Sequence, residues 1–317
     1  MKADEKCSCG ESLKEEILRL KKERGAVILA HYYQQGEIQD LADFIGDSLA
    51  LAQIARTLKE DVIVLCGVHF MGETAKILCP DKTVLVPDVN AGCSLADSCQ
   101  ADEFAEFIKA HPGHTVLSYV NTSAAVKALT DIVVTSSNAL SIVKQLPEDE
   151  KIIFGPDRNL GSYINRMTGR EMVLWDGACH VHEQFSVEKL IELKKANPDA
   201  EVLAHPECKK VVLMLADVVG STAKLLKHAQ ESEGKKYIVA TESGILHEMR
   251  KSCPDKEFIP VPPTDSTCGC NDCSYMKLNT LEKLRDCLKN MSPAIEVDAE
   301  TAAKAVKPIE RMLEMSK

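Results

Sequence analysis

The sequence has few aromatic residues and no long apolar run. Aromatic residues make up 4% of the 317 residues, with a single Trp, so the core must be largely aliphatic. The longest apolar runs, such as residues 211–216, are far too short to cross a bilayer. The charged first residues contain no apolar segment of the kind found in signal peptides. We therefore expect a cytoplasmic protein that does not bind a membrane.

Positive charge is outnumbered by negative charge. Lys and Arg number 38 against 48 Asp and Glu, which gives a formal net charge of −10 at pH 7. An acidic chain repels phosphate backbones, so a nucleic-acid partner is not expected. The hydrophobic content of 45% is typical of a globular protein, and the length suits two average domains or three small ones.

Cysteine, in contrast, is abundant, at thirteen residues. In a reducing compartment these cysteines should not form a disulfide framework, so metal binding becomes the leading explanation for some of them. Four others lie in apolar helix or strand patterns and are expected to be packing residues, namely Cys66, Cys79, Cys208 and Cys287. Cys7 and Cys9, near the start of the chain, are expected to be peripheral.

Short apolar runs alternate with helical patterns along the chain, as at residues 26–30 and 62–65. This order predicts an α/β fold with parallel sheets and right-handed crossovers. Three sets of residues also recur at fixed spacing, a sign of internal repeats. The sets are His31, Tyr119 and His205; Asp43, Asp131 and Asp217; and Val84, Met172 and Phe258, with steps of 88 and 86 residues in each.

The repeat predicts three homologous α/β/α domains with parallel sheets about a pseudo-threefold axis, with the active site at the centre. The expected domains are residues 1–93, 94–179 and 180–273. The tail, residues 274–317, has helical patterns at 278–290 and after Val297, and it is expected to pack back on the first domain. The set that includes Val84 is expected to open a short strand in each domain.

A pair of polar residues closes one expected strand in each domain. The pairs are His31 with Tyr33, Tyr119 with Asn121, and His205 with Glu207. Because the members of a pair are two residues apart, we expect both to point to one face of the strand. Ligands of open parallel sheets bind beyond the carboxyl ends of the strands, so these residues are candidates for a shared site.

A hydroxyl residue precedes a helical pattern in each domain, at Ser48, Ser136 and Thr222. A Ser or Thr in this place is typical of a helix N-cap. The N-terminus of a helix can also bind an anion through its free N–H groups and its dipole. Three such ends that face one axis would hold a substrate with several carboxylates or a phosphate.

A loop with cysteine follows the last expected strand of each domain. The first two loops hold Cys93 and Cys179, and the third holds Cys268, Cys270 and Cys273, among which the repeat does not choose. Structural zinc usually takes four local ligands, whereas three separated thiolates suit an Fe–S cluster with one iron left open. An open iron acts as a Lewis acid on substrate oxygen, which predicts dehydration chemistry.

Several segments resemble signatures of the quinolinate synthase family. They are Ala30-His-Tyr-Tyr33, Gly46-Asp-Ser48, Ser118-Tyr-Val-Asn-Thr122, His205-Pro-Glu207, Gly220-Ser-Thr222 and Cys273-Ser-Tyr-Met-Lys-Leu-Asn279. The resemblance spans about residues 25–290. It implies condensation of iminoaspartate with dihydroxyacetone phosphate to quinolinate, with loss of phosphate and two waters, at a [4Fe–4S] cluster. It also implies functional coupling to an L-aspartate oxidase.

The resemblance implies a role for each site residue. The cluster ligands would be Cys93, Cys179 and Cys273, and Ser48, Ser136 and Thr222 would bind substrate carboxylate or phosphate. Tyr33 and Glu207 would be the acid–base groups, His31 and His205 would hydrogen-bond substrate oxygens, and Tyr119 and Asn121 would position the substrate. Cys268 and Cys270 would be a redox pair, although their spacing differs from the family's Cys-x-x-Cys-x-x-Cys pattern.

Two alternatives stay open from the sequence alone. One is another Fe–S hydro-lyase or thiolate metalloenzyme with a different substrate. The other is a non-enzymatic scaffold stabilised by zinc, or a redox-sensing binding protein.

Overall fold

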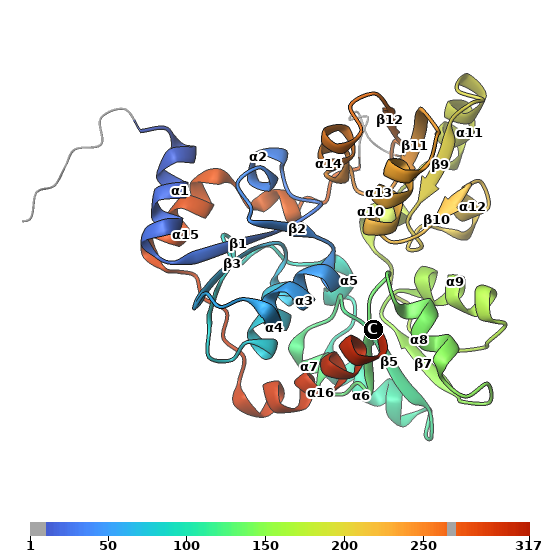
Figure 1. The fold of residues 1–317 in the computed structure, drawn as a ribbon. Helices are drawn as coiled ribbons and strands as arrows, with labels where there is room; N and C mark the ends of the chain where they lie inside the picture. Colours follow the sequence, from blue (N-terminus) through green and yellow to red (C-terminus); the bar gives the residue numbers. More distant parts are fainter. Residues whose placement is uncertain (1–10, 265–270) are drawn as a thin grey trace, which may run out of the picture.

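The chain folds into three α/β units, each built on its own parallel sheet (Figure 1). The computed structural model describes residues 11–264 and 271–317. Each sheet has four strands, and in every sheet the unit's first strand lies between its second and its third, with the fourth outside the third. The strand pairs within the sheets all run parallel. The predicted α/β class with parallel sheets is therefore confirmed.

The first unit has a sheet that helices cover on both faces. Its strands, in order across the sheet, are β2 (Phe44–Gly46), β1 (Ala26–His31), β3 (Val62–Cys66) and β4 (Thr83–Leu85). Its helices are α1 (Leu13–Glu23), α2 (Gly36–Gln39), α3 (Ser48–Thr57) and α4 (His69–Leu78). All residues of β1 and β3 are buried, as is usual for parallel strands that are covered on both sides.

The second unit repeats this order. Its strands are β6 (Ile132–Val134), β5 (Thr115–Tyr119), β7 (Ile152–Gly155) and β8 (Val173–Leu174). Its helices are α5 (Ser94–Asp97), α6 (Ala101–Lys109), α7 (Ala124–Lys127), α8 (Ala139–Gln145) and α9 (Arg158–Thr168). The core of this sheet is aliphatic, with Leu117, Ile132 and Ile153 fully buried.

The third unit has the same strand order again. Its strands are β10 (Val218–Val219), β9 (Glu201–Ala204), β11 (Lys236–Ala240) and β12 (Glu257–Pro260). Its helices are α10 (His180–Glu183), α11 (Val187–Ala196), α12 (Lys210–Leu213), α13 (Thr222–Glu231) and α14 (Ile245–Ser252). Two buried clusters, one on each face of β9 and β11, form its core.

An aspartate braces the first strand of every unit in the same way. The bonds are Ile28 N–H to Asp43 Oδ2 at 2.8 Å, Val116 N–H to Asp131 Oδ2 at 2.8 Å, and Val202 N–H to Asp217 Oδ2 at 2.7 Å. The N–H of each aspartate donates back to the carbonyl of the same strand residue at 2.9 Å. The recurring aspartate found in the sequence therefore has the same structural role in all three units.

Each of the three expected strand starts is off by one residue. Val84 and Phe258 lie one residue inside β4 and β12, and Met172 stands just before β8. The backbone of Met172 instead pairs with the side chain of Asn165, which donates to its carbonyl at 3.2 Å and accepts from its N–H at 3.0 Å. A local side-chain partner has therefore replaced the sheet partner.

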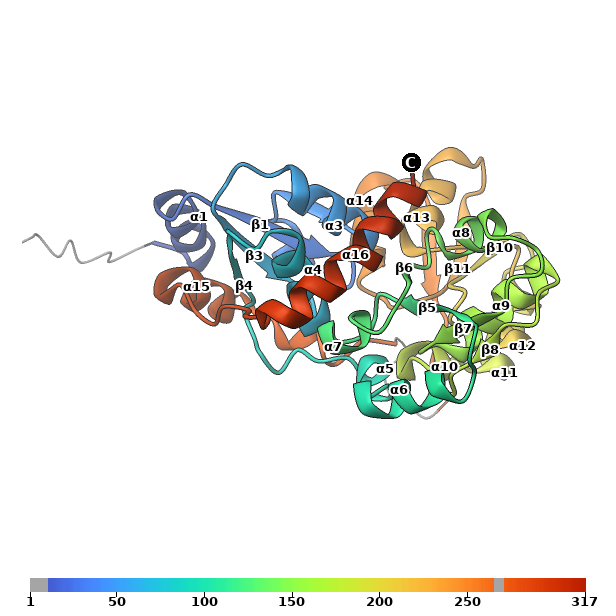
Figure 2. The ribbon, with the colours of Figure 1, turned by 90° about the horizontal axis from the view of Figure 1, so that it is seen from below.

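The tail packs across the first two units. A 3₁₀ turn, η1 (Met276–Leu278), leads to α15 (Leu281–Asn290), which packs against α1. The long helix α16 (Ala299–Met315) then lies against α4, α7 and β6, as Figure 2 shows. Its buried Ile309, Met312 and Leu313 belong to a core that the first and second units share. The predicted domain boundaries themselves stay predictions.

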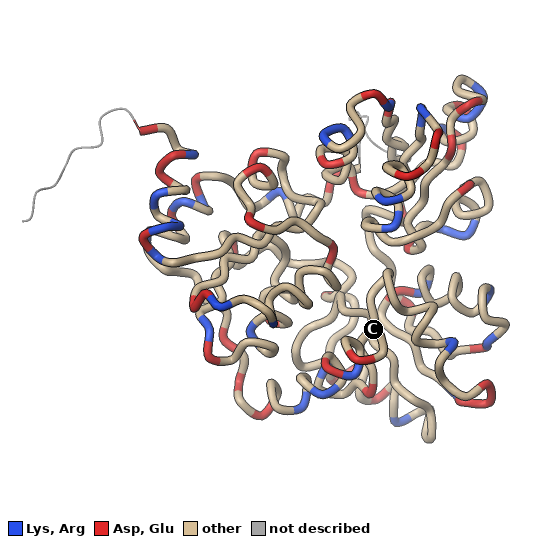
Figure 3. Tube along the Cα trace, viewed as in Figure 1, with Lys and Arg blue, Asp and Glu red and all other residues tan. Residues whose placement is uncertain are grey.

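Charged residues of both signs are interspersed around the periphery of all three units (Figure 3). Within the described ranges, 11–264 and 271–317, the structure contains no helix that is both long and apolar enough to cross a membrane.

Candidate active site

A single cavity collects residues from all three units. Its empty volume is about 720 Å³, counting the space that opens to solvent. The cavity is lined by every site residue expected from the sequence, namely His31, Tyr33, Ser48, Cys93, Tyr119, Asn121, Ser136, Cys179, His205, Glu207, Thr222 and Cys273. Their individual roles stay predictions.

The polar pairs reach the cavity in a different way from the one expected. His31 and Tyr119 end β1 and β5, but their partners follow the strands, and β9 ends at Ala204, before both members of its pair. The chain turns at once after the strand, since Gln34 N–H donates to the His31 carbonyl at 3.0 Å. The expectation that each pair lies on one strand face is therefore wrong, and tight turns carry both members into the cavity.

Two buried histidines are held in one tautomer. The Nδ1 of His31 accepts the N–H of Tyr33 at 3.1 Å, and the Nδ1 of His205 accepts the N–H of Glu207 at 3.4 Å. Burial lowers the pKa of both imidazoles to about 3, so both are neutral at pH 7. A neutral imidazole that accepts at Nδ1 carries its proton at Nε2. Each histidine therefore offers one N–H donor for a substrate oxygen.

The three hydroxyl residues are not N-caps. The cap of α3 is Asp47, which accepts the N–H of Ala50 at 3.0 Å, and the cap of α13 is Ser221. The cap of α8 is Asn138. Ser48 and Thr222 are instead the first residues of their helices, and Ser136 precedes the cap of α8. The capping interpretation is therefore wrong, because neighbouring residues hold the cap positions and leave these hydroxyls beside the cavity.

Glu207 is buried and surrounded by hydrogen-bond donors. The phenol of Tyr119 donates to its Oε1, and Nδ1 of His182 lies 3.0 Å from its Oε2. Burial acts to raise the pKa of this carboxyl. His205, which is protonated in the acid range where Glu207 titrates, outweighs burial together with His182 and the bond from Tyr119, and the pKa is held below its usual range. Glu207 is therefore ionised at neutral pH and can accept a proton from a bound substrate.

The Tyr33 phenol lies between two threonines. Its oxygen is 2.7 Å from Oγ1 of Thr222 and 2.9 Å from Oγ1 of Thr241. Burial raises the pKa of Tyr33 well above its ordinary value, so the phenol keeps its proton and is a hydrogen-bond donor. Oγ1 of Thr241 also lies 3.0 Å from Nε2 of His182.

His182 and Thr241 were missed by the sequence reasoning. His182 follows Cys179 by three residues, which places both on one turn of a helix, and this spacing is the signal that could have found it. Thr241 gave no such signal, because the residues at its place after β3 and β7 are Gly67 and Pro156.

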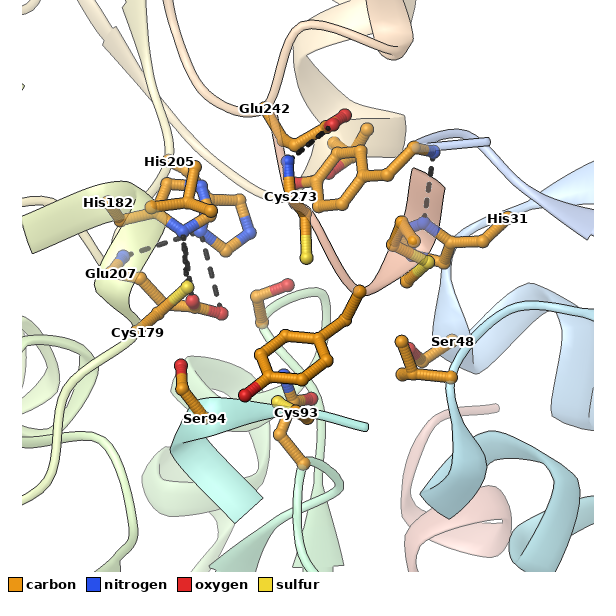
Figure 4. A pocket seen from close by; sticks show the side chains of 18 of the residues that line it. His31, Ser48, Cys93, Ser94, Cys179, His182, His205, Glu207, Glu242 and Cys273 are labelled. Atoms are coloured by element: carbon orange, nitrogen blue, oxygen red, sulfur yellow. Dashed lines mark hydrogen bonds and ion pairs between the residues drawn. The ribbon is translucent and has the colours of Figure 1, made fainter. Parts of the chain in front are cut away.

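Three cysteines differ from the other described ones. All nine cysteines in the described part of the chain are free thiols, and only Cys93, Cys179 and Cys273 among them are not fully buried. Figure 4 shows these three arranged around the same open space. The cysteines expected to be packing residues are all buried, as predicted. Cys7, Cys9, Cys268 and Cys270 lie outside the described residues.

Buried carboxylates support two of the three cysteines. The N–H of Cys179 donates to Oδ2 of Asp157 at 3.2 Å, and the N–H of Cys273 donates to Oε1 of Glu242 at 3.0 Å. Asp157 and Glu242 occupy the same place in their units, two residues after the ends of β7 and β11. Nζ of Lys277 lies 3.0 Å from Oε1 of Glu242, so that carboxylate has a cation partner. Both carboxylates were also missed from the sequence.

The three cavity thiols suit a shared cationic metal centre. Burial raises the pKa of Cys93 to about 12 and raises the pKa values of Cys179 and Cys273 as well. Three thiolates this close to one cavity would therefore be unfavourable without positive charge between them. A bound metal centre supplies that charge and deprotonates the thiols that ligate it. The donor set thus fits an iron–sulfur cluster held by three cysteines.

A second group of possible ligands overlaps this set. Ligand atoms of Cys179, His182 and Glu207 all lie within 4.8 Å of one another. Both nitrogens of His182 and both oxygens of Glu207 already have hydrogen-bond or ion-pair partners within the chain. This arrangement favours a hydrogen-bonded network over a single bound ion at these three residues.

Two comparisons with known proteins agree on one family. The family described as "Quinolinate synthetase A protein" matches residues 15–314. Proteins named quinolinate synthase from Synechocystis sp. and Nostoc punctiforme are each 59% identical over 300 residues, which is 95% of this chain and 94% and 92% of those proteins. One from Chloroherpeton thalassium is 57% identical over 303 residues, 96% of this chain and 94% of that protein. The chain therefore belongs to the quinolinate synthetase A protein family.

Proposed function

We propose that this chain is an enzyme that makes quinolinate in its central cavity. Iminoaspartate and dihydroxyacetone phosphate would condense there, and phosphate and two waters would leave. The observation that carries this proposal is the convergence of three thiols, two neutral histidines and an ionised carboxylate on one cavity. The names of the similar proteins support it.

The chain's own side chains can bind and orient two anionic substrates. His31 and His205 would donate their Nε2–H groups to substrate oxygens, because their Nδ1 atoms already accept backbone N–H groups. The hydroxyls of Ser48, Ser136 and Thr222 would bind carboxylate or phosphate oxygens. Their position at or near helix starts adds the favourable helix dipole. Asn121 would hold the substrate from the second unit.

Proton transfer would divide between two groups in opposite states. Glu207 is ionised and would take a proton from a carbon or nitrogen of the bound substrate, and the Tyr119 bond keeps the carboxylate in place. Tyr33 keeps its proton and would donate to a leaving oxygen. A base and an acid with pKa values pushed apart by their surroundings are typical of acid–base sites.

Cys93, Cys179 and Cys273 would hold a [4Fe–4S] cluster. When bound, this group supplies a Lewis-acidic iron that assists the loss of water from a substrate hydroxyl. Asp157 and Glu242 would keep the backbones of two of these cysteines in place.

Iminoaspartate is an imine and hydrolyses in water, so a nearby source is needed. We propose functional coupling to an L-aspartate oxidase that supplies it. The free thiols of the nine described cysteines are compatible with the reducing cytoplasm that we propose as the compartment.

The test is anaerobic purification of the wild type and of Cys93→Ser, Cys179→Ser and Cys273→Ser, with Cys253→Ser as control. Cys253 is also a free cysteine but is buried away from the cavity. The content of iron, sulfide and zinc is determined for each protein, and its visible spectrum is recorded. Quinolinate is assayed by chromatography, with iminoaspartate generated in situ.

We expect about four irons and four sulfides per chain in the wild type and the control, with loss in each of the other three variants. Retention of the cluster in Cys273→Ser would move the third ligand to Cys268 or Cys270. A wild type that carries zinc without iron after anaerobic reconstitution would overturn the cluster. A loaded protein that makes no quinolinate would overturn the reaction.

A further inference from the structure

One lysine of the tail joins the first unit to the third. Nζ of Lys277, in η1, lies 3.0 Å from Oε1 of Glu242 and donates to the carbonyl of Tyr33 at 2.7 Å. Glu242 follows β11 in the third unit, whereas Tyr33 follows β1 in the first. A single ammonium group therefore bridges two turns from different units, and both turns border the cavity.

The backbone of Cys273 is held on both sides by the same pair of residues. Its N–H donates to Oε1 of Glu242 at 3.0 Å, and its carbonyl accepts the N–H of Lys277 at 3.1 Å. Figure 4 shows Glu242 beside this cysteine. Because Nζ of Lys277 also contacts Oε1 of Glu242, the bonds form a closed ring of Cys273, Glu242 and Lys277. The ring fixes the direction in which the chain presents the Cys273 thiol.

The cation distinguishes the third unit from the other two. At the equivalent place after β7, Asp157 accepts the N–H of Cys179, but in the described part of the chain Asp157 forms no ion pair. After β3 this place is Val68, which has no carboxylate. The bridge made by Lys277 is therefore a departure from the internal repeat, at the cysteine where the chain leaves the third unit for the tail.

The ring depends on the charge of Lys277. Glu242 is fully buried, whereas the Lys277 side chain is 23% exposed. When a buried carboxylate loses its cation, an uncompensated charge is left in the protein interior, which is strongly unfavourable. Removal of the ammonium group should therefore loosen Glu242 and its bond to the N–H of Cys273. The carbonyl of Tyr33 would lose its bond from Nζ at the same time.

We propose that Lys277 is a positioning residue that ties the Cys273 segment at the end of the third unit to the Tyr33 turn of the first, and so holds the third thiol in place for the metal centre. It acts through Glu242 and the backbone of Cys273. This proposal rests on the proposed function, which gives Cys273 the role of a cluster ligand.

The test compares Lys277→Met with Lys277→Arg. Methionine has nearly the length of lysine without its charge, whereas arginine keeps the charge, and Lys277 lines a second pocket that has room for the larger head group. Lys194→Met is the matched control. Nζ of Lys194 also donates to one carbonyl, that of Leu215, and lies 3.6 Å from one carboxylate, that of Asp217, but away from the central cavity.

Two measurements are made on each protein. The release of iron from the loaded protein to a ferrous chelator is followed under anaerobic conditions. The hydrogen exchange of the metal-free protein is followed by mass spectrometry, because exchange reports local opening of the chain without any need for activity.

We expect Lys277→Met to release iron about 10- to 100-fold faster than the wild type, the usual effect of losing a residue that orients a metal ligand. Exchange should rise in residues 31–36 and 271–279 together and stay unchanged elsewhere, whereas a general loss of stability would raise it throughout the chain. Lys277→Arg should recover most of both properties, and Lys194→Met should match the wild type.

Wild-type iron release or wild-type exchange in Lys277→Met would overturn the proposal. So would equal effects of the Met and Arg variants, or faster exchange in only one of the two segments. If Lys277→Met does not fold, Lys277→Gln removes the same charge for the same comparison.

Failure of the proposed function is seen separately, as a wild type that holds no cluster after anaerobic reconstitution. In that case the exchange of the metal-free proteins still decides whether Lys277 ties the two segments together. A joint rise in residues 31–36 and 271–279 of Lys277→Met supports the tie, and unchanged exchange overturns it.

Discussion

Lys127 is a buried cation whose removal should change the pH dependence of stability. It is fully buried at the end of α7, where its Nζ donates to the carbonyls of Val120 and Thr122. The ring of Phe70 lies 5.3 Å from Nζ. These bonds fix the turn that carries Asn121 into the cavity. Burial lowers the pKa of Lys127 from its ordinary 10.5 to about 8, although the charge of Glu73 opposes the shift.

The sign of the effect follows from proton binding. Between pH 8 and pH 10.5 the unfolded chain keeps the Lys127 proton and the folded chain has lost it, so stability rises with pH across this window. Each pKa unit corresponds to about 1.4 kcal/mol, so the wild type should gain about 3 kcal/mol from this residue between pH 7 and pH 10.5. The variant Lys127→Met cannot gain it.

A second contribution sets the difference at neutral pH. The carbonyl of Val120 keeps a donor in Lys127→Met, because the N–H of Thr122 bonds it at 2.8 Å. The carbonyl of Thr122 loses the bond from Lys127. An unsatisfied buried acceptor costs about 1–3 kcal/mol, but at pH 7 the variant is also free of the buried charge that costs the wild type about 3 kcal/mol, so we expect the two proteins to differ little in stability at pH 7. We also expect slower quinolinate formation, because Asn121 is less well held.

Urea unfolding of the wild type and Lys127→Met, under anaerobic reducing conditions from pH 7 to about pH 10, measures the difference in unfolding free energy. That difference should widen as the pH rises above 8. Lys109→Met is the control, because the Lys109 side chain is 69% exposed, and its curve should run parallel to the wild type. A difference for Lys127→Met that is flat across the whole range would refute the assignment of a buried, easily deprotonated amine.

Burial raises the pKa of the Cys99 and Cys287 thiols to about 12, so neither should be alkylated by iodoacetamide near neutral pH until the chain unfolds. Mass spectrometry of labelled peptides checks this, and rapid labelling of the native protein would contradict it. A Cβ added by Gly244→Ala would lie 2.7 Å from Cα of Tyr33, so we expect a displaced Tyr33 and a lower kcat. Crystallography and the quinolinate assay test this, and an unmoved Tyr33 would show that the site adapts. Asp47→Ala removes the cap of α3 and should lower stability by about 1–2 kcal/mol in thermal unfolding, whereas Asp47→Asn should keep most of it.

Much of the fold was predictable because the same order of strands and helices recurs in three units. The Asp43 set marks a brace that recurs with nearly equal geometry in each unit, so its spacing carries structural information. The exact strand start at Met172 was not predictable, because the side chain of Asn165 competes there for the backbone. The path of α16 across two units was also beyond the sequence, since helical periodicity shows a buried face without showing which surface covers it.

The residues of the candidate site also fall into those that the internal repeat predicted and those that it did not. Residues that follow the repeat, such as His31 and His205, were found because symmetry places them at one end of parallel strands. Thr241 was missed because its equivalents have no hydroxyl. Ser48 was found for an incomplete reason, since the preceding Asp47 takes the cap position that its hydroxyl was expected to hold. Adjacent side chains compete for the same N–H groups at a helix start, and residue type alone does not show which of them becomes the cap.

The path of α16 has a consequence for the order of synthesis. The ribosome makes this helix after the strands of all three sheets, yet its buried Ile309, Met312 and Leu313 complete the core under β6 and α4. While translation of residues 299–317 is unfinished, the emerged first and second units therefore expose an apolar surface. Chaperones that bind apolar segments should engage the nascent chain at this stage, and a stop codon before Ala299 should yield a product that is degraded or aggregates.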